Sequence, residues 1–237
     1  MRRDPLTPSG EVHLPLSSAH LTGNLEIPDP AQGIVVFAHG SGSSRMSPRN
    51  GSVARRLRDA GLATLLTDLL TPEEEALDLE RGHLRFDIAL LAGRLLAVTD
   101  WLTRQGSVRS LPLGYFGAST GAGAALLAAA ERGDAVRAVV SRGGRPDLAG
   151  PALHRVTAPT LLIVGGADPE VLELNRAALA HLRCDKQLRI VPGASHLFPE
   201  PGALEEVARL AAAWFRRHFG QPEWASSTVD RLDASVR

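Results

Sequence analysis

Ser119 lies in the segment Gly117-Ala-Ser-Thr-Gly121, which has the G-x-S-x-G spacing. The apolar run 111–116 predicts a strand before this segment, and the alanine-rich run 122–131 predicts a helix after it. A serine on a sharp strand-to-helix turn exposes its hydroxyl above the sheet edge, and the flanking glycines leave room for the turn. The helix N-terminus behind the serine supplies N–H groups for a developing oxyanion. The pattern therefore predicts a nucleophile, the alternative being a small-residue turn that only packs a helix on a sheet.

A serine nucleophile needs a general base and an acid that orients the base. Asp168 follows the predicted strand 160–164, and His196 follows the predicted strand 187–191. The chain order Ser, Asp, His is the order found in α/β-hydrolases, and all three residues come after the carboxyl ends of strands, where open α/β sheets place their sites. We therefore predict a triad of Ser119, Asp168 and His196.

Two alternatives to Asp168 as the triad acid remain open. Asp147 follows the preceding predicted strand, 136–140, and has the same relation to the sheet. Asp168 itself stands before Pro169 and a predicted helix, so it could serve only as a turn former or helix cap.

The segment His39-Gly-Ser-Gly42 follows the predicted strand 33–38. In this architecture the second oxyanion-hole donor comes from the loop after that strand, and the first comes from the residue after the nucleophile. We expect the backbone N–H groups of Ser41 and Thr120 to form the hole, with Gly42 as the alternative to Ser41. His39 is interpreted as a structural residue that braces the loop.

Two arginines are predicted on the same rim as Ser119. Arg45 lies in the loop after the strand 33–38, and Arg142 follows the strand 136–140. A guanidinium grips a carboxylate through two parallel hydrogen bonds. We predict that they favour substrates carrying an anion; pairing with a nearby acid such as Asp147, or simple solvation, is the alternative.

Strands that alternate with helices along the chain predict an α/β fold with a mostly parallel central sheet covered by helices on both faces. Residues 11–27 look like an antiparallel edge hairpin with a turn at Gly23-Asn24. Pro72 opens a polar stretch for which no helix is predicted. We expect one domain over residues 1–219 and a polar tail over 220–237. The other predicted helices span 52–60, 86–102, 171–182 and 204–219.

Composition narrows the function classes. The formal net charge is zero, so no global field attracts nucleic acid or an anionic membrane. No apolar run approaches the roughly 18 residues of a membrane span, and the N-terminus lacks a signal-peptide core, so a cytoplasmic protein is expected. Cys184 is the single cysteine, and no zinc-binding or P-loop pattern occurs, so we expect neither a metal nor a nucleotide cofactor. The oligomeric state is left open.

Four motifs taken together resemble the α/β-hydrolase superfamily, and the short chain without a large lid insertion is similar to its dienelactone hydrolase-like branch. The resemblance spans residues 11–219. Dienelactone hydrolases proper use a cysteine where this chain has Ser119. The resemblance implies hydrolysis of an ester or related acyl bond in a small-molecule substrate, of carboxylesterase, lactonase or thioesterase type, without a cofactor. A non-catalytic binding protein on the same scaffold is the alternative. The motifs are His39-Gly-Ser-Gly42, Gly117-Ala-Ser-Thr-Gly121, Gly165-Gly-Ala-Asp168 and Gly193-Ala-Ser-His196.

Overall fold

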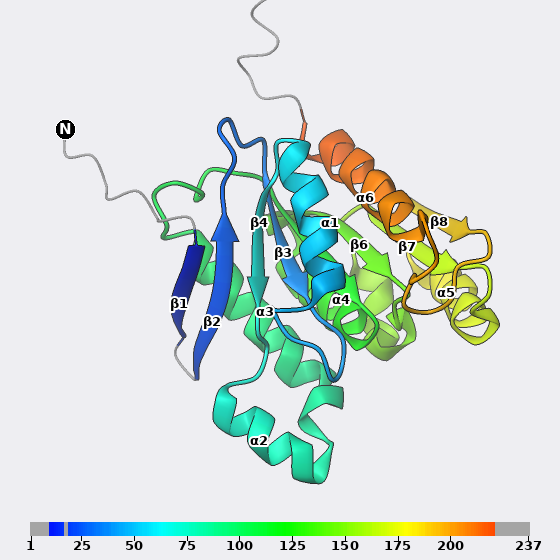
Figure 1. Ribbon diagram of the computed structural model, residues 1–237, viewed down its shortest axis with the longest axis horizontal. Helices are drawn as coiled ribbons and strands as arrows, with labels where there is room; N and C mark the ends of the chain where they lie inside the picture. Colours follow the sequence, from blue (N-terminus) through cyan, green and yellow to red (C-terminus); the bar gives the residue numbers. More distant parts are fainter. Residues whose placement is uncertain (1–9, 17–18, 221–237) are drawn as a thin grey trace, which may run out of the picture.

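The computed structural model describes residues 10–16 and 19–220 (Figure 1). These residues form an eight-stranded sheet in the order β1-β2-β4-β3-β5-β6-β7-β8. The strands are β1 (Gly10–Leu16), β2 (Ala19–Glu26), β3 (Ile34–Ala38), β4 (Ala63–Thr67), β5 (Leu113–Ala118), β6 (Val136–Arg142), β7 (Thr160–Gly165) and β8 (Lys186–Val191). The α-helices are α1 (Pro48–Asp59), α2 (Pro72–Arg81), α3 (Ile88–Leu102), α4 (Thr120–Arg132), α5 (Pro169–His181) and α6 (Ala203–Phe219). Short 3₁₀ segments are η1 (Leu84–Phe86), η2 (Gly133–Ala135) and η3 (Pro146–Arg155).

The six strands from β4 to β8 in the sheet order are parallel, whereas the β1–β2 and β2–β4 pairs are antiparallel. Strands β3, β4 and β5 are buried throughout, as expected for strands covered on both faces. This arrangement confirms the predicted α/β fold. The carboxyl ends of β3, β5, β6, β7 and β8 meet at one edge of the sheet, called here the carboxyl edge.

The edge hairpin is confirmed, but its predicted turn at Gly23-Asn24 is wrong. Both residues lie inside β2, where Gly23 pairs with Val12 and Asn24 with Glu11, so the chain reverses between Leu16 and Ala19. The role of Gly23 is therefore not to form a turn but to leave room for a side chain of the neighbouring strand. A β-carbon there would lie 2.8 Å from the Leu65 Cδ1 of the next strand.

Helices cover both faces of the sheet (Figure 1). Helices α1 and α6 pack against one another and on one face, where Phe37 and Phe116 stack with ring centroids 4.8 Å apart. Helices α3, α4 and α5 cover the other face. There the Tyr115 hydroxyl meets the Thr99 hydroxyl at 2.6 Å, and burial raises the pKa of Tyr115 to about 12. The sheet thus separates two cores, each closed by its own helices.

Helix α2 is not predicted from the sequence, and it lies beyond the carboxyl edge at the bottom of Figure 1. Its start is a capping box. Thr71 accepts the Glu74 N–H at 3.2 Å, and the Glu74 carboxylate accepts the Thr71 N–H at 2.9 Å. The same carboxylate pairs with Arg94 of α3 at 2.6 Å. Helix α2 and η1 are called the cap below, because they stand over the loops that carry the site.

Several element boundaries also differ from the predictions. Helix α1 begins at Pro48, four residues before the predicted start, because Ser47 caps it by accepting the Asn50 N–H at 3.3 Å. The predicted helix 86–102 begins at Ile88, after η1. Segment η3 occupies a region predicted as loop. At the far end, the ring of Phe219 covers Gly33, just before β3.

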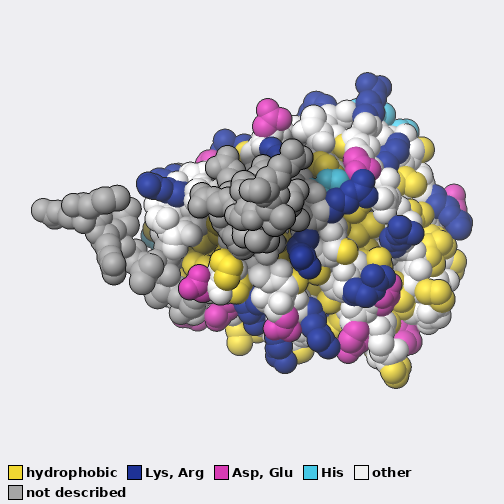
Figure 2. Space-filling model, turned by 90° about the horizontal axis from the view of Figure 1, so that it is seen from above, with side chains coloured by type: hydrophobic (Ala, Val, Ile, Leu, Met, Phe, Trp, Pro, Cys, Tyr) yellow, Lys and Arg dark blue, Asp and Glu magenta, His cyan; other side chains and the backbone are white. Residues whose placement is uncertain are grey.

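The described residues contain no helix with the length and apolar character that crossing a bilayer requires. Seen from above, basic and acidic side chains are interspersed over the visible face, without one sign covering it (Figure 2). Residues 221–237, which make up nearly all of the predicted tail, lie outside the described residues.

Candidate active site

Ser119 occupies the turn between β5 and α4 in a backbone conformation that is unusual for a residue with a side chain. Its φ is 50° and its ψ −123°. Such conformations cost of order 1–3 kcal/mol and persist only where the surroundings hold them. The Ser119 N–H donates to the Arg142 carbonyl at 3.3 Å, and the Arg145 N–H donates to the Ser119 carbonyl at 3.0 Å. The turn is therefore fixed by the segment that follows β6.

The two motif glycines allow the tight passage of the chain around Ser119. A β-carbon at Gly117 would collide with the backbone of Ala122, and one at Gly121 with the carbonyls of Ala38 and His39. Helix α4 can therefore start directly against the end of β3. This is the strand–turn–helix geometry that exposes a nucleophile.

The structure brings Asp168 and His196 together across 28 residues of sequence. The distance from the His196 Nδ1 to the Asp168 Oδ2 is 2.7 Å. A carboxylate only accepts hydrogen bonds, so Nδ1 carries the proton, and Nε2 of the neutral ring remains an acceptor. Asp168 stands at the N-cap of α5 but makes no side-chain capping bond. Its carboxylate is thus committed to the imidazole and not to the helix.

Asp147, the rival acid, has a different partner. Its carboxylate pairs with Arg145 in a fork, with Nε–Oδ1 at 2.9 Å and Nη2–Oδ2 at 2.8 Å. The fork, together with other interactions, raises the pKa of Arg145. No hydrogen bond joins Asp147 to His196.

The end of β6 connects Ser119 to His196. A β-carbon at Gly143 would lie 2.9 Å from the His196 carbonyl oxygen and 3.6 Å from its Cε1. Gly143 follows Arg142, whose carbonyl accepts the Ser119 N–H. The His196 imidazole and Ser119 therefore share one neighbouring segment, the end of β6. The sequence does not predict this role of Gly143, since it depends on a contact between loops 53 residues apart.

The loop after β3 lies beside Ser119. A β-carbon at Gly40 would lie 3.0 Å from the Ser119 Cβ. The Leu69 N–H donates to the His39 Nε2 at 3.3 Å, so the His39 Nδ1 carries the proton and donates to the Gly40 carbonyl at 3.0 Å. His39 therefore braces the loop.

The predicted oxyanion donors, Ser41 and Thr120, are in direct contact. The Ser41 N–H donates to the Thr120 Oγ1 at 2.9 Å. Thr120 is the first residue of α4 and is buried. The Thr120 side chain thus positions the loop after β3. The sequence motif points only to the backbone N–H of Thr120 and not to its hydroxyl.

A cavity of about 140 Å³ opens beside this loop. The β3 loop and Thr120 form one wall, and Asp68, Asp78 and Leu79 lie on the cap side. Asp78 is paired with Arg85, which also lines the space. Among the described residues no three His, Cys, Asp or Glu side chains are grouped so that they could hold a metal ion.

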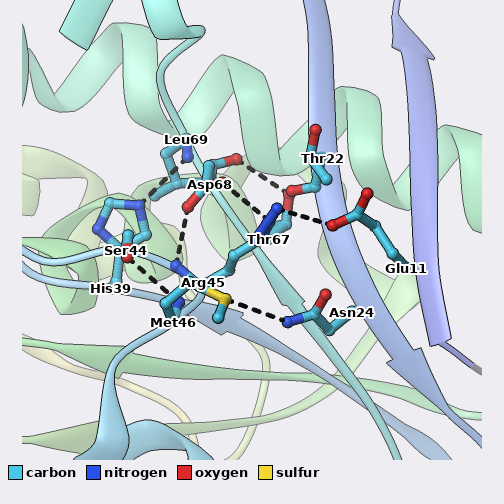
Figure 3. Close-up of polar contacts among 10 residues, drawn as sticks. All are labelled: Glu11, Thr22, Asn24, His39, Ser44, Arg45, Met46, Thr67, Asp68 and Leu69. Carbon is cyan, nitrogen blue, oxygen red and sulfur yellow. Dashed lines mark hydrogen bonds and ion pairs between the residues drawn. The ribbon is translucent and has the colours of Figure 1, made fainter.

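Figure 3 shows that Arg45 is engaged by two acids. Its Nη2 lies 2.9 Å from the Glu11 Oε2 of β1, and its Nε lies 3.2 Å from the Asp68 Oδ2. Its backbone N–H donates to the Asp68 Oδ1 at 2.8 Å. Arg45 therefore ties the loop after β3 to the loop after β4 and to the edge strand.

Arg142, the other predicted arginine, is buried at the end of β6 with a residue exposure of 6%. Its Nε and Nη1 are buried and have no hydrogen-bond partner among the described residues. Burial first, and then the charge of Arg49 in α1, lower the pKa of Arg142 to about 10. The sequence analysis does not select Arg49, because no motif in its own segment predicts that it lies near Arg142.

The mostly parallel sheet with helices on both faces is the α/β-hydrolase fold. The family model for the dienelactone hydrolase family matches residues 21–219, and the chain belongs to that family. A dienelactone hydrolase structure from Anabaena variabilis is 62% identical, with a TM-score of 0.86, covering 87% of this chain and 96% of that one. Est1E from Butyrivibrio proteoclasticus shares the fold at 17% identity, with a TM-score of 0.75 over 90% of this chain and all of that one.

Two curated proteins from strains of Mycobacterium tuberculosis are each 59% identical over 92% of this chain. They are provisionally named phosphoribosyl transferases. The chain spans 48% of their length, so about half of each relative has no counterpart in the matched region.

Proposed function

We propose that this chain is a serine hydrolase that cleaves an ester or related acyl bond through an acyl-enzyme. The observation that carries the proposal is the 2.7 Å contact between the His196 Nδ1 and the Asp168 Oδ2, at the same edge of the sheet as a serine in a strained elbow. Membership of the dienelactone hydrolase family supports hydrolytic chemistry. The cavity beside the β3 loop offers room for a small acyl substrate.

In the proposed first step the Ser119 Oγ bonds to the acyl carbon while its proton passes to the His196 Nε2. Asp168 holds the ring in the right tautomer and stabilises the imidazolium that forms. The tetrahedral intermediate then collapses, and the leaving alcohol or thiol takes the proton from Nε2. A water molecule repeats the sequence on the acyl-enzyme, which releases the acid and restores Ser119 and neutral His196.

The proposed oxyanion hole uses the N–H groups of Thr120 and Ser41, with Gly42 as the alternative to Ser41. Because the Ser41 N–H is bonded to the Thr120 hydroxyl, the substrate oxygen has to replace that hydroxyl. Removing one such donor typically costs about 10²–10³ in turnover.

Labelling with a fluorophosphonate probe tests the nucleophile directly. The probe should modify Ser119, as located by peptide mass spectrometry, and the Ser119→Ala protein should stay unlabelled. Turnover of an activated neutral ester should accompany the labelling. A chain that bound small molecules without catalysis on the same scaffold would show no turnover, and that result would refute the hydrolase proposal.

A further inference from the structure

The cavity between the loop after β3 and the cap begins next to Ser119. Gly40 and Thr120 both line it, and a β-carbon at Gly40 would lie 3.0 Å from the Ser119 Cβ. The cavity has a volume of about 140 Å³. An apolar cavity of about 150 Å³ binds one benzene molecule, so a chain of about six carbon atoms fits a space of this size. The cavity can therefore hold part of a small substrate beside Ser119.

The charged groups that line this cavity are mostly engaged by the protein itself. The Asp68 carboxylate holds the side chain and the backbone N–H of Arg45. The Arg85 guanidinium donates from Nη2 to the Asp78 carbonyl at 2.7 Å, and its Nε pairs with the Asp78 carboxylate. Glu75, which is exposed, adds a further negative charge to the lining. The Arg85 cation is thus committed to Asp78, and Glu75 repels an anion placed in the cavity.

Three leucines give the cavity its apolar surface. Leu91 of α3 is buried, Leu70 in the loop after β4 is half-buried, and Leu79 of α2 is 76% exposed. Single exposed leucines are common on protein surfaces and need no explanation. Leu79 differs from them because it borders a cavity next to Ser119, where a ligand would cover its side chain.

The cap holds Leu79 in place beside the cavity. The preceding residue, Asp78, is buried, and its Oδ1 accepts the Leu84 N–H at 2.6 Å. At the other end of the helix, the Glu74 carboxylate closes the capping box and pairs with Arg94 at 2.6 Å. Helix α2 is thus tied to η1 and to α3. An apolar surface that is already positioned loses little conformational entropy when a ligand binds to it.

The two arginines that the sequence suggested as anion-binding residues lie outside the described lining of this cavity. Arg45 is already paired with two acids. Side chains alternate along a strand, so Arg142 shares the face of Val140, which packs in the core under α1 and α6. Arg142 and its neighbour Arg49 therefore lie on the α1 side of Ser119, whereas the cavity lies on the cap side.

The position of His196 determines which part of the substrate enters the cavity. In the proposed reaction the carbonyl oxygen of the acyl group lies against the N–H groups of Thr120 and Ser41, and both residues line the cavity. The leaving alcohol or thiol takes its proton from His196, which is not among the described residues that line it. The leaving group therefore lies toward His196, and the acyl chain extends into the cavity.

We propose that the cavity binds the acyl group of the substrate as an uncharged aliphatic chain of about four to six carbon atoms, and that Leu79 determines this preference. The chain would be covered by Leu70, Leu79 and Leu91. Each methylene that becomes fully buried strengthens binding about fourfold. This inference rests on the proposed serine hydrolase, because it names the substrate class of that same site.

Two p-nitrophenyl esters of different acyl length test the preference. The intact protein should show a kcat/KM at least about tenfold higher for the hexanoate ester than for the acetate ester, since the added methylenes enter the cavity. Leu79→Ala should reduce this ratio about 3- to 10-fold, and Leu79→Met, which keeps an apolar side chain of similar volume, should restore most of it. An equal kcat/KM for the two esters in the intact protein, or a ratio that survives Leu79→Ala, would overturn the proposal.

Leu77→Ala is the matched control. Leu77 lies two residues before Leu79 in the same helix and is 51% exposed, but it is outside the described lining of the cavity. This variant removes the same side chain from the same helix and should keep the hexanoate-to-acetate ratio of the intact protein. An equal fall in the ratio with both variants would mean that the cap acts only through its stability, which refutes the role of Leu79.

A second pair of esters tests the charge preference. The p-nitrophenyl monoester of adipate ends in a carboxylate, and that of 6-methylheptanoate is its uncharged counterpart of similar shape. The kcat/KM should be about tenfold lower for the adipate ester, because its carboxylate loses hydration in the cavity. Glu75→Gln should narrow this difference, whereas Glu80→Gln, on the same helix but outside the described lining, should not. An equal or higher kcat/KM for the adipate ester would overturn the proposal.

Binding to the cavity can also be measured without catalysis. Hexanamide is uncharged and carries the same chain, so it should raise the Tm of the intact protein in millimolar titration, whereas acetamide should not. Leu79→Ala should reduce the shift, and Leu77→Ala should keep it. The absence of a shift with hexanamide would refute the cavity site. A shift in a protein that hydrolyses none of the esters would support the cavity site and refute only the hydrolase proposal.

Discussion

The two sides of Ser119 differ in how their buried charges are paired. On the cap side, Glu74 pairs with Arg94, and the buried Asp78 pairs with Arg85. On the α1 side, Arg142 and Arg49 have no described acid between them. Both sides contain buried charged residues, so burial alone does not distinguish the two sides. The presence of a partner does distinguish them, because the cap-side charges form ion pairs whereas Arg142 and Arg49 have no described acid partner.

Asp78 illustrates the cap side. Its Oδ1 accepts the Leu84 N–H at 2.6 Å and the Arg85 N–H at 3.3 Å, and its Oδ2 pairs with the Arg85 Nε. Burial acts to raise the pKa of Asp78, but the Arg85 guanidinium and the N–H donors outweigh it, and the pKa is lowered. Every strong contact of this carboxylate is internal, and it joins the end of α2 to η1.

The largest expected effect lies where the two sides meet. Ser119→Ala should lower kcat by about 10⁶ for both neutral and anionic esters, since both sides serve one nucleophile. Steady-state assays with one neutral and one anionic p-nitrophenyl ester measure this, with circular dichroism as the check that the fold is kept. Turnover of either ester near the wild-type rate would contradict Ser119 as the nucleophile.

A somewhat smaller loss is expected from Asp168→Asn, about 10⁴ in kcat, because the amide favours the wrong imidazole tautomer. Asp147→Asn is the matched control, as Asp147 is held by Arg145 and not by His196. Its kcat should stay within a few-fold of the intact protein. The reverse ranking of these two variants would reassign the triad acid to Asp147.

The free energy of unfolding should respond differently to substitution of the two buried arginines, Arg94 and Arg142. Arg94→Met should cost about 2 kcal/mol in the free energy of unfolding, because it leaves Glu74 without its partner. Arg142→Met should cost nothing or raise stability, since it replaces an uncompensated charge by an apolar chain. Urea unfolding of both variants without added anions makes the comparison. A loss at Arg142 as large as that at Arg94 would mean that a structural partner supports it.

The helix cap of α2 should have a more modest effect. Thr71→Ala removes the acceptor of the Glu74 N–H and should cost about 1 kcal/mol. Thr71→Ser keeps the acceptor and should retain most of that stability. Hydrogen exchange of the α2 amides locates the loss, which should stay within the cap. Faster exchange at α1 as well would show that the two sides are not independent.

Alkylation of Cys184 is expected to have no effect on turnover. Cys184 lies between α5 and β8, at the edge of the sheet opposite Ser119, and burial raises the pKa of its thiol. Alkylation with iodoacetamide should therefore be slow and leave turnover unchanged. Parallel loss of activity and of free thiol would contradict a serine nucleophile.

The strands and the site residues that the sequence predicts correctly are those marked by local patterns of residues. Apolar runs mark β3, β5 and β7, and parallel strands place the residues that follow them at one edge, so the sequence alone is enough to propose Ser119 and Asp168. Helix α2 escapes such prediction because its surface is polar, although Thr71-Pro-Glu-Glu74 has the spacing of a capping box.

The features that the sequence does not predict depend on contacts between segments far apart in the chain. The Ser41 N–H meets the Thr120 hydroxyl across 79 residues, and Arg45 meets Glu11 across 34. Whether an arginine is paired cannot be read from its own neighbours in the sequence. Arg45 and Arg142 therefore look alike in the sequence but have opposite surroundings in the fold.

The packing of Phe219 on Gly33 has a practical consequence. Gly33 precedes β3, so the last turn of α6 is anchored at the edge of the sheet opposite the loop that lies against Ser119. In Figure 1 this end of α6 points away from α2. A fluorescent reporter or a surface-immobilisation tag attached beyond this anchor would be directed away from the mouth of the site and would leave it accessible to incoming molecules.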